Sequence, residues 1–274
     1  MTALTDVRPE PADPAWRPPP GSRRPALWLL RQAAHRTDMP PLGELDAAER
    51  TRAARFVHAP DSALYAVAHV ALRRVLAAYL RISPADVRFA RDSCPSCGGP
   101  HGRPVLDGAS PRTLHFSLSH SPGLVLIAVA EAPVGVDVER VRSSEAAAIL
   151  VPSLHPAERA ELARLPDEQL PMAVCCLWTR KEAYLKGIGT GLCRELDADC
   201  LGERAGVEGP AGWTVRNVHC GPGQRSHAAA VALPAAAPEP VLGLLPDLYA
   251  YAAPAVHELG GLSAPTAPAG RTGR

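Results

Sequence analysis

Two acidic residues and a lysine-bearing motif have a spacing suited to binding a metal ion and a phosphate. In the segment GVDVE, Asp137 and Glu139 stand two positions apart among branched apolar residues, a pattern that predicts a β-strand. Side chains two apart in a strand project from the same face, so these two carboxylates should point together. Taken alone, the pair also fits the solvated outer face of a half-exposed strand.

The motif WTRKEAYLK, from Trp178 to Lys186, predicts a helix that carries a third carboxylate. Helical spacing places Glu182 and Lys186 on one stripe, with Lys181 one step round the helix. Of the chain's 29 Lys and Arg residues, only these two are lysine. A surface helix with an ordinary Glu–Lys pair would look the same. Joined with the strand acids, Glu182 completes a set of three carboxylates suited to Mg²⁺, with the lysine ready for a bound phosphate.

A third segment that could bind a ligand is HFSLSHS, which ends a predicted strand before a Pro-Gly turn. Ser119 and His120 offer a hydroxyl, an imidazole and nearby backbone amides, which together could hold an anion. A polar turn with a structural histidine is the competing interpretation. Upstream, Arg103 and a cluster at Arg50, Arg52 and Arg55 could bind a further phosphate.

The pattern of elements predicts an α+β protein of two similar halves, each a small antiparallel sheet packed with helices. Strands are expected at 25–30, 113–119, 124–130, 134–141, 212–218 and 227–233, and helices at 45–56, 62–80, 156–165 and 170–187. We expect a disordered Pro-rich leader at 1–25, an N-terminal half at 26–133, a C-terminal half carrying the metal site at 134–233 and an Ala/Pro-rich tail at 234–274.

Composition narrows the class of protein. A formal net charge of +1 gives no reason to expect bulk binding to nucleic acid or to an anionic membrane. The longest apolar run, residues 124–130, is too short to span a bilayer, and the start of the chain lacks the pattern of a secretion signal. We therefore expect a cytoplasmic protein whose seven cysteines remain thiols or bind metal.

One cysteine motif stands outside this scheme. Cys94-Pro-Ser-Cys97 followed by His101 has the spacing of half a zinc site, but no second CxxC or HxxxH follows. Cys220 and His227 are distant candidates for a fourth ligand. A reduced turn that tightens the loop is the preferred interpretation, with structural Zn²⁺ as its alternative.

The order HGRP, SHS, GVDVE and WxxKExxxK resembles the phosphopantetheinyl transferases, specifically the longer, two-halved type that activates peptide and polyketide synthases. The resemblance covers about residues 45–190. It implies a pseudo-twofold arrangement of the halves with coenzyme A in the cleft between them. It also implies transfer of the phosphopantetheine arm to a serine of an apo carrier protein, with release of adenosine 3',5'-bisphosphate.

The resemblance also implies residue roles. Asp137, Glu139 and Glu182 match the Mg²⁺ ligands, with Glu182 also the base for the carrier serine, directly or through water. Lys186 matches a lysine that contacts the phosphates of coenzyme A, and Lys181 matches another lysine of the cleft. Ser119 and His120 match residues that contact the phosphates. Arg103 matches a residue near the adenine, and Arg52 matches a residue near the 3'-phosphate. The family's further phosphate-binding arginine falls on apolar Leu64 or Tyr65.

The expected partners are coenzyme A and apo acyl or peptidyl carrier proteins of polyketide, nonribosomal peptide or fatty acid synthases, with no nucleic acid and no membrane. A monomer is expected, because the two halves belong to one chain. Two alternatives remain open at this point: a metal-dependent phosphodiesterase or nuclease, and a zinc-containing interaction module built around Cys94 to His101. A nuclease would need a broad basic track for the nucleic-acid backbone, which the net charge argues against.

Overall fold

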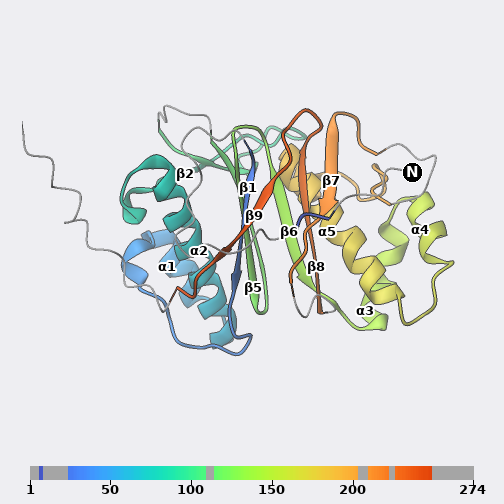
Figure 1. Cartoon of the computed structure of the whole chain (residues 1–274), viewed down its shortest axis with the longest axis horizontal. Coiled ribbons are helices and arrows are strands. Elements are labelled where there is room, and N and C mark those ends of the chain that lie inside the picture. Colours follow the sequence, from blue (N-terminus) through green and yellow to red (C-terminus); the bar gives the residue numbers. More distant parts are fainter. Residues whose placement is uncertain (1–5, 9–23, 109–113, 203–208, 222–225, 249–274) are drawn as a thin grey trace, which may run out of the picture.

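The computed structural model describes residues 6–8, 24–108, 114–202, 209–221 and 226–248. Its helices and strands form two parts, and the last strand of the chain returns to the first part (Figure 1). The first part contains β1 (Ala26–Arg31), α1 (Ala47–Ala54), α2 (Ala59–Leu80), β2 (Phe89–Arg91), β3 (Pro104–Leu106), β4 (His115–Ser121) and β5 (Leu124–Ala130). The second contains β6 (Gly135–Arg140), α3 (Ser144–Leu150), α4 (Pro156–Leu162), α5 (Leu170–Ile188), β7 (Trp213–Asn217) and β8 (His227–Pro234). Strand β9 (Val241–Leu245) follows these elements in the chain but belongs to the sheet of the first part. The predicted α+β class is confirmed, and the pseudo-twofold relation of the halves stays a prediction.

The first part is built on a four-stranded sheet in the order β4-β5-β1-β9. Helix α2 covers one face of this sheet, where Val67, Val70 and Leu76 pack against Trp28 and Ile127. By length and composition α2 could cross a membrane, but most of it is buried in this packing, as in a core helix. It begins at Ala59, before the expected start at residue 62, because proline fits the first turn of a helix.

Strand β9 changes the expected sheet. Val241–Leu245 lies within the predicted tail, yet it pairs in parallel with β1, opposite Ala26 to Leu30. The first sheet is therefore mixed, not purely antiparallel as expected. The segment VLGLL is apolar at alternate and at neighbouring positions, so it can pack against both faces of the sheet beside β1. This explains why it forms a strand of the sheet. Val7, in the predicted leader, is buried in the core between the two sheets and forms a parallel bridge with Val218. Residues 1–5, 9–23 and 249–274 of the predicted leader and tail lie outside the described residues.

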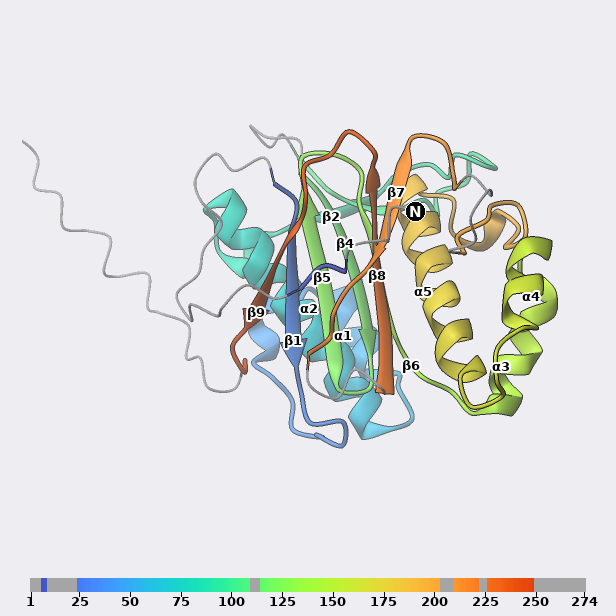
Figure 2. The ribbon, with the colours of Figure 1, turned by 45° about the vertical axis from the view of Figure 1, so that its right-hand side comes forward.

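The second part is an antiparallel sheet in the order β6-β8-β7, and α5 packs along its outer face. Figure 2 shows the two sheets face to face, with α2 outside one and α5 outside the other. Between the sheets lies a second core, which includes Leu27, Leu126, Val136, Val138 and Val231. Because Val136 and Val138 turn into this core, the alternate residues of β6 must face α5.

Two glycines allow β6 and α5 to lie unusually close. A Cβ atom added to Gly135 would lie 1.9 Å from the carbonyl oxygen of Ala183, and one added to Gly187 would lie 2.7 Å from the Trp213 ring. Only residues without a side chain fit such a contact between strand and helix. Close packing at these two positions brings the acids of β6 within reach of the polar stripe of α5.

Candidate active site

The centre of the site is Asp137 on β6, a carboxylate that is only 3% exposed. Its Oδ1 accepts hydrogen bonds from Lys186 Nζ at 2.6 Å and from Ser119 Oγ at 2.8 Å. Lys186 Nζ also lies 3.2 Å from the carbonyl oxygen of Val136, which fixes the ammonium over the strand. The other oxygen, Oδ2, is buried and receives no hydrogen bond from any residue that the structure describes.

Asp137 also affects the ionisation of Glu139 on β6 and of Glu182 on α5. Burial raises the pKa of Glu139, and the nearby carboxylates of Asp137 and Glu182 raise it further, against the opposing effects of Arg142 and Lys186. Burial also raises the pKa of Glu182, where Lys186 acts in the lowering direction and Asp137 in the raising one. Asp137 therefore disfavours the charged form of both glutamates, and a cation bound here would stabilise that charged form.

The chemistry of these groups fits Mg²⁺. A buried carboxylate oxygen without a hydrogen-bond donor is costly unless something else satisfies it, and Asp137 Oδ2 is such an atom. Glu139 and Glu182 add two further oxygen donors of the kind that Mg²⁺ prefers. In the structure, Asp137 and Glu182 influence the ionisation of Glu139, Asp137 influences that of Glu182, and Lys186 pairs with Asp137.

Ser119 has a second partner besides Asp137. Its Oγ accepts the backbone N–H of Val138 at 3.2 Å, and its neighbours do the same along the strand. Ser117 Oγ accepts from Val136 N at 3.0 Å and Ser121 Oγ accepts from Arg140 N at 2.8 Å. Serines at alternate positions of β4 therefore close the free edge of β6 and join the two sheets. The sequence shows this alternation in FSLSHS, but the edge that it serves is visible only in the structure.

His120 points the other way from Ser119, toward α2. Its ring makes an edge contact with Tyr65, the centroids being 6.4 Å apart, and Tyr65 in turn lies against His69. Burial, the nearby His69 and the Lys186 ammonium lower the pKa of His120 to about 4, against the opposing carboxylates of Asp137 and Asp61. His120 is therefore neutral near pH 7 and can offer a single N–H to an anion.

Two arginines lie at the borders of the site. Arg103, just before β3, donates from Nε to Asp92 Oδ2 at 3.1 Å and from Nη1 to the carbonyl oxygen of Gly187 at 3.2 Å, directly after Lys186. Arg52 is exposed on α1, with its guanidinium 5.9 Å from the centre of the Phe56 ring. Phe56 contacts Tyr65, so a row of rings connects Arg52 with His120.

Lys181 is the one predicted site residue that the structure places elsewhere. Its side chain is 2% exposed and its Nζ pairs with Glu158 Oε2 at 2.9 Å, a carboxylate that is fully buried. The same ammonium donates to the carbonyl oxygens of Leu196 and Asp199, both at 2.7 Å. Its three donors are used by Glu158 on α4 and by two carbonyl groups of the segment after α5, so Lys181 has no donor left for a phosphate.

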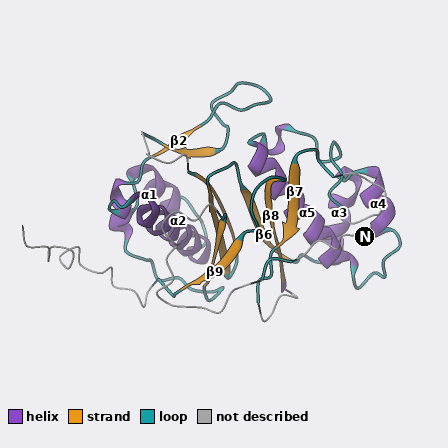
Figure 3. Cartoon of the chain, turned by 45° about the horizontal axis from the view of Figure 1, so that its top comes forward, coloured by secondary structure: helices purple, strands orange, loops and turns teal. Residues whose placement is uncertain are grey.

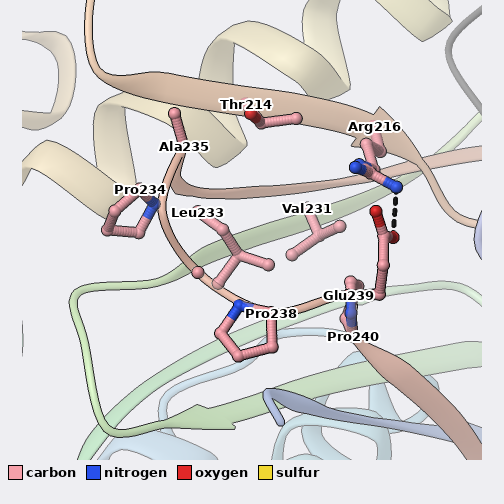
Figure 4. Close-up of a pocket in the computed structure, with 10 residues that line it drawn as sticks. Thr214, Arg216, Val231, Leu233, Pro234, Ala235, Pro238, Glu239 and Pro240 are labelled. Atoms are coloured by element: carbon pink, nitrogen blue, oxygen red, sulfur yellow. Dashed lines mark hydrogen bonds and ion pairs between the residues drawn. The ribbon is translucent and has the colours of Figure 1, made fainter.

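A small surface pocket lies on the β6-β8-β7 sheet and the loop after β8, on the face that does not carry α5. Figure 4 shows Val231 and Leu233 on its floor and the Arg216–Glu239 ion pair at its side. No residue of the carboxylate cluster lines it. Its apolar floor and single ion pair make it unsuited to a pyrophosphate.

Comparisons with known proteins agree with this chemistry. The family model of the 4'-phosphopantetheinyl transferase superfamily matches residues 133–230, which include Asp137, Glu139, Glu182 and Lys186. The chain is 33% identical over 192 residues to the 4'-phosphopantetheinyl transferase HetI of Nostoc sp., covering 65% of this chain and 76% of that protein.

The similar proteins include two from Bacillus subtilis. A 4'-phosphopantetheinyl transferase is 27% identical over 158 residues, 57% of this chain and 66% of its own length. The 4'-phosphopantetheinyl transferase Sfp is 28% identical over 152 residues, 55% of this chain and 62% of its own. These similarities favour a transferase over the nuclease and the interaction module that the sequence left open. The chain therefore belongs to the 4'-phosphopantetheinyl transferase superfamily, in its long type, and is an enzyme of carrier-protein phosphopantetheinylation.

Proposed function

We propose that Asp137, Glu139 and Glu182 are the Mg²⁺ ligands of this transferase and that Lys186 binds the pyrophosphate of coenzyme A beside them. The observation that carries the proposal is the buried Asp137 Oδ2, which has no donor among the described residues although Oδ1 has two. When bound there, Mg²⁺ would supply positive charge to the phosphates as negative charge builds up on them.

Glu182 is the proposed base. Burial raises its pKa, whereas coordination to Mg²⁺ would lower it, which favours proton transfer through a water molecule. The carrier serine gives its proton to Glu182, directly or through water, and its oxygen forms a bond to the β-phosphorus of coenzyme A. The bond from that phosphorus to the bridging oxygen breaks, and adenosine 3',5'-bisphosphate leaves. Lys186 keeps its ammonium beside the phosphate oxygens throughout.

Of the remaining predicted site residues, one positions the Asp137 carboxylate and the others bind coenzyme A. Ser119 acts mainly by holding Asp137, since its hydroxyl is already engaged with that carboxylate and with Val138 N. His120 offers its N–H to a phosphate. Arg103 and Arg52 are proposed to lie near the adenine and the 3'-phosphate, and Arg103 is supported by its hydrogen bond to Gly187 at the end of α5.

We propose apo acyl or peptidyl carrier proteins of polyketide, nonribosomal peptide or fatty acid synthases as the substrates, acting in the cytoplasm with a monomeric enzyme. Incubation of such carriers with this protein, coenzyme A and Mg²⁺ should add the mass of one phosphopantetheine arm, and EDTA should abolish the gain. Full transfer in EDTA would refute the metal proposal, and no transfer to several carriers would refute the proposed range of substrates.

A further inference from the structure

Four metal-binding side chains form a group that includes none of the three carboxylates. Cys94, Cys97 and His101 come from the loop between β2 and β3, and Cys193 comes from a short 3₁₀ helix, Gly191–Cys193, beyond α5. One ligand atom from each lies within 4.8 Å of the others, and Cys97 Sγ lies 2.9 Å from His101 Nε2. Cys193 thus joins three residues that stand at least 92 positions before it in the sequence.

The geometry suits zinc. Zn–S bonds of about 2.3 Å and Zn–N bonds of about 2.0 Å in a tetrahedron separate the ligand atoms by about 3.5 to 3.8 Å. A group whose four ligand atoms all lie within 4.8 Å needs only small side-chain adjustments to reach that arrangement. Three cysteines and one histidine form a usual structural zinc set, and thiolate sulfur does not favour Mg²⁺ or Ca²⁺.

The backbone of the loop is shaped around these side chains. Cys94 N–H donates to the carbonyl oxygen of Gly99 at 2.7 Å, and Gly98 N–H donates to the carbonyl oxygen of Cys94 at 2.8 Å. Gly98 has a φ of +71°, which favours glycine. A Cβ atom on Gly99 would lie 2.9 Å from His101 Cδ2 and 3.3 Å from Cys97 Sγ, so a side chain there would displace the ligands.

The structure also corrects the expected fourth ligand. Cys220 is 2% exposed and belongs to the core between the two sheets, and His227 Nε2 lies 2.9 Å from the carbonyl oxygen of Pro122. Neither belongs to the Cys94 group. Cys193 takes that place, and its distance along the sequence explains why spacing alone could not identify it.

We propose that Cys94, Cys97, His101 and Cys193 bind one structural Zn²⁺ that fastens the β2–β3 loop to the segment after α5. Four protein ligands close the coordination shell, which is typical of structural and not of catalytic zinc. The β2–β3 sheet has only three residues in each strand and stands apart from the two large sheets (Figure 3). Such a small hairpin gains more from a metal cross-link than a large sheet would.

The position of the cluster gives the zinc a role in the transferase. A Cβ atom on Gly189, the residue that ends α5, would lie 3.7 Å from Pro95 Cγ and 3.7 Å from Arg103 Cδ. The same loop holds Arg103 against Gly187, next to Lys186. Zinc binding should therefore fix Arg103 at the end of the catalytic helix. This consequence for coenzyme A binding rests on the proposed function, whereas the zinc site itself does not.

Metal analysis of the full chain tests the site. Protein produced with zinc in the medium and purified under reducing conditions without chelator should contain about one Zn²⁺ per chain by mass spectrometry of the metal. Cys193→Ala and Cys97→Ala should lose the zinc and lower Tm. Cys220→Ala, the matched control at the rejected ligand position, should keep it. Cobalt in place of zinc should produce the visible absorption of a tetrahedral cobalt–thiolate centre.

Several outcomes would overturn the proposal. One is folded wild-type protein that neither contains nor takes up zinc. A second is a Cys193→Ala protein that keeps its full zinc content. A third is a disulfide of Cys193 in the enzyme purified under reducing conditions. If the cysteine variants do not fold, wild-type protein stripped of metal and titrated with Zn²⁺ against a coloured chelator gives the answer. Because zinc is measured without coenzyme A or carrier, failure here leaves the Mg²⁺-dependent transfer assay to be judged separately.

Discussion

Ser119 Oγ, on β4, donates a 2.8 Å hydrogen bond to Asp137 Oδ1 and accepts one from the N–H of Val138, and both of these partners are on β6. One hydroxyl thus joins the edge strands of the two sheets and also orients the carboxylate at the centre of the site. The catalytic geometry and the packing of the two halves are therefore coupled at this residue.

Replacing Ser119 should affect both properties. Ser119→Ala removes one partner from Asp137 and leaves Val138 N–H unsatisfied, so we expect a loss of about 1 to 3 kcal/mol in the free energy of unfolding. It should also raise the Mg²⁺ concentration needed for half-maximal transfer. Ser121→Ala, which loses only the bond to Arg140 N, is the control: similar destabilisation with an unchanged Mg²⁺ requirement. Equal Mg²⁺ curves for both variants would contradict the holding role of Ser119.

The metal proposal predicts the effect of changing Asp137. Asp137→Asn keeps the shape of the side chain but removes the charge, so the protein should fold while transfer falls by about 100-fold or more. Rates come from the intact mass of the carrier over time at several Mg²⁺ concentrations. Glu168→Gln, at an exposed carboxylate before α5, should behave as wild type. A fully active Asp137→Asn protein would remove this residue from the metal site.

The two lysines should respond in opposite ways. Lys181→Met leaves the buried Glu158 without its partner and should cost about 3 to 5 kcal/mol of stability, because an unpaired buried charge is expensive. The fraction that folds should keep the wild-type KM for coenzyme A. Lys186→Met should lose less stability, because the Lys186 side chain is 31% exposed and water can take its place beside Asp137, and it should be nearly inactive. Denaturant unfolding together with transfer kinetics separates the two, and the double change Lys181→Met/Glu158→Gln should recover part of the lost stability.

His120 should titrate far below an ordinary histidine. Its pKa of about 4 in the free enzyme lies below the usual 6.5, so the unfolded chain takes up the proton first as the pH falls. The stabilising contribution of neutral His120 is therefore present above pH 6.5 and is lost as the pH falls toward 4. Unfolding at several pH values should show a shallower dependence of stability on pH for His120→Asn than for wild type. An NMR titration that gives His120 a pKa near 6.5 would contradict this account.

Close packing of β6 and α5 can be tested at Gly135. Gly135→Ala would place a methyl group against the Ala183 carbonyl, so we expect at least about 1 to 3 kcal/mol of destabilisation and a loss of transfer as Lys186 moves from Asp137. Gly43→Ala is the matched control, because a Cβ atom there meets nothing within 4 Å. Equal Tm values for the two variants would show that the strand and helix can separate without cost.

Much of the site follows from local periodicity. Strand alternation puts Asp137 and Glu139 on one face, and helical spacing puts Glu182 and Lys186 on one stripe, so short-range geometry alone predicts these pairs. The strands β1, β4, β5, β6, β7 and β8 and the helices α1, α2, α4 and α5 also lie close to their expected ranges. Helix α3, the short β2–β3 hairpin and β9 were not expected.

Tertiary packing decided the rest. Lys181 and Lys186 look alike in the sequence, but the direction of each around α5 sends one to buried Glu158 and the other to Asp137. Ser119 became a holding residue because β4 lies along the edge of β6, and Cys193 joined the Cys94 group because the chain returns there after α5. A sequence specifies which side chains share a local face. Which faces meet depends on contacts between distant segments, and those contacts carry no fixed spacing along the chain.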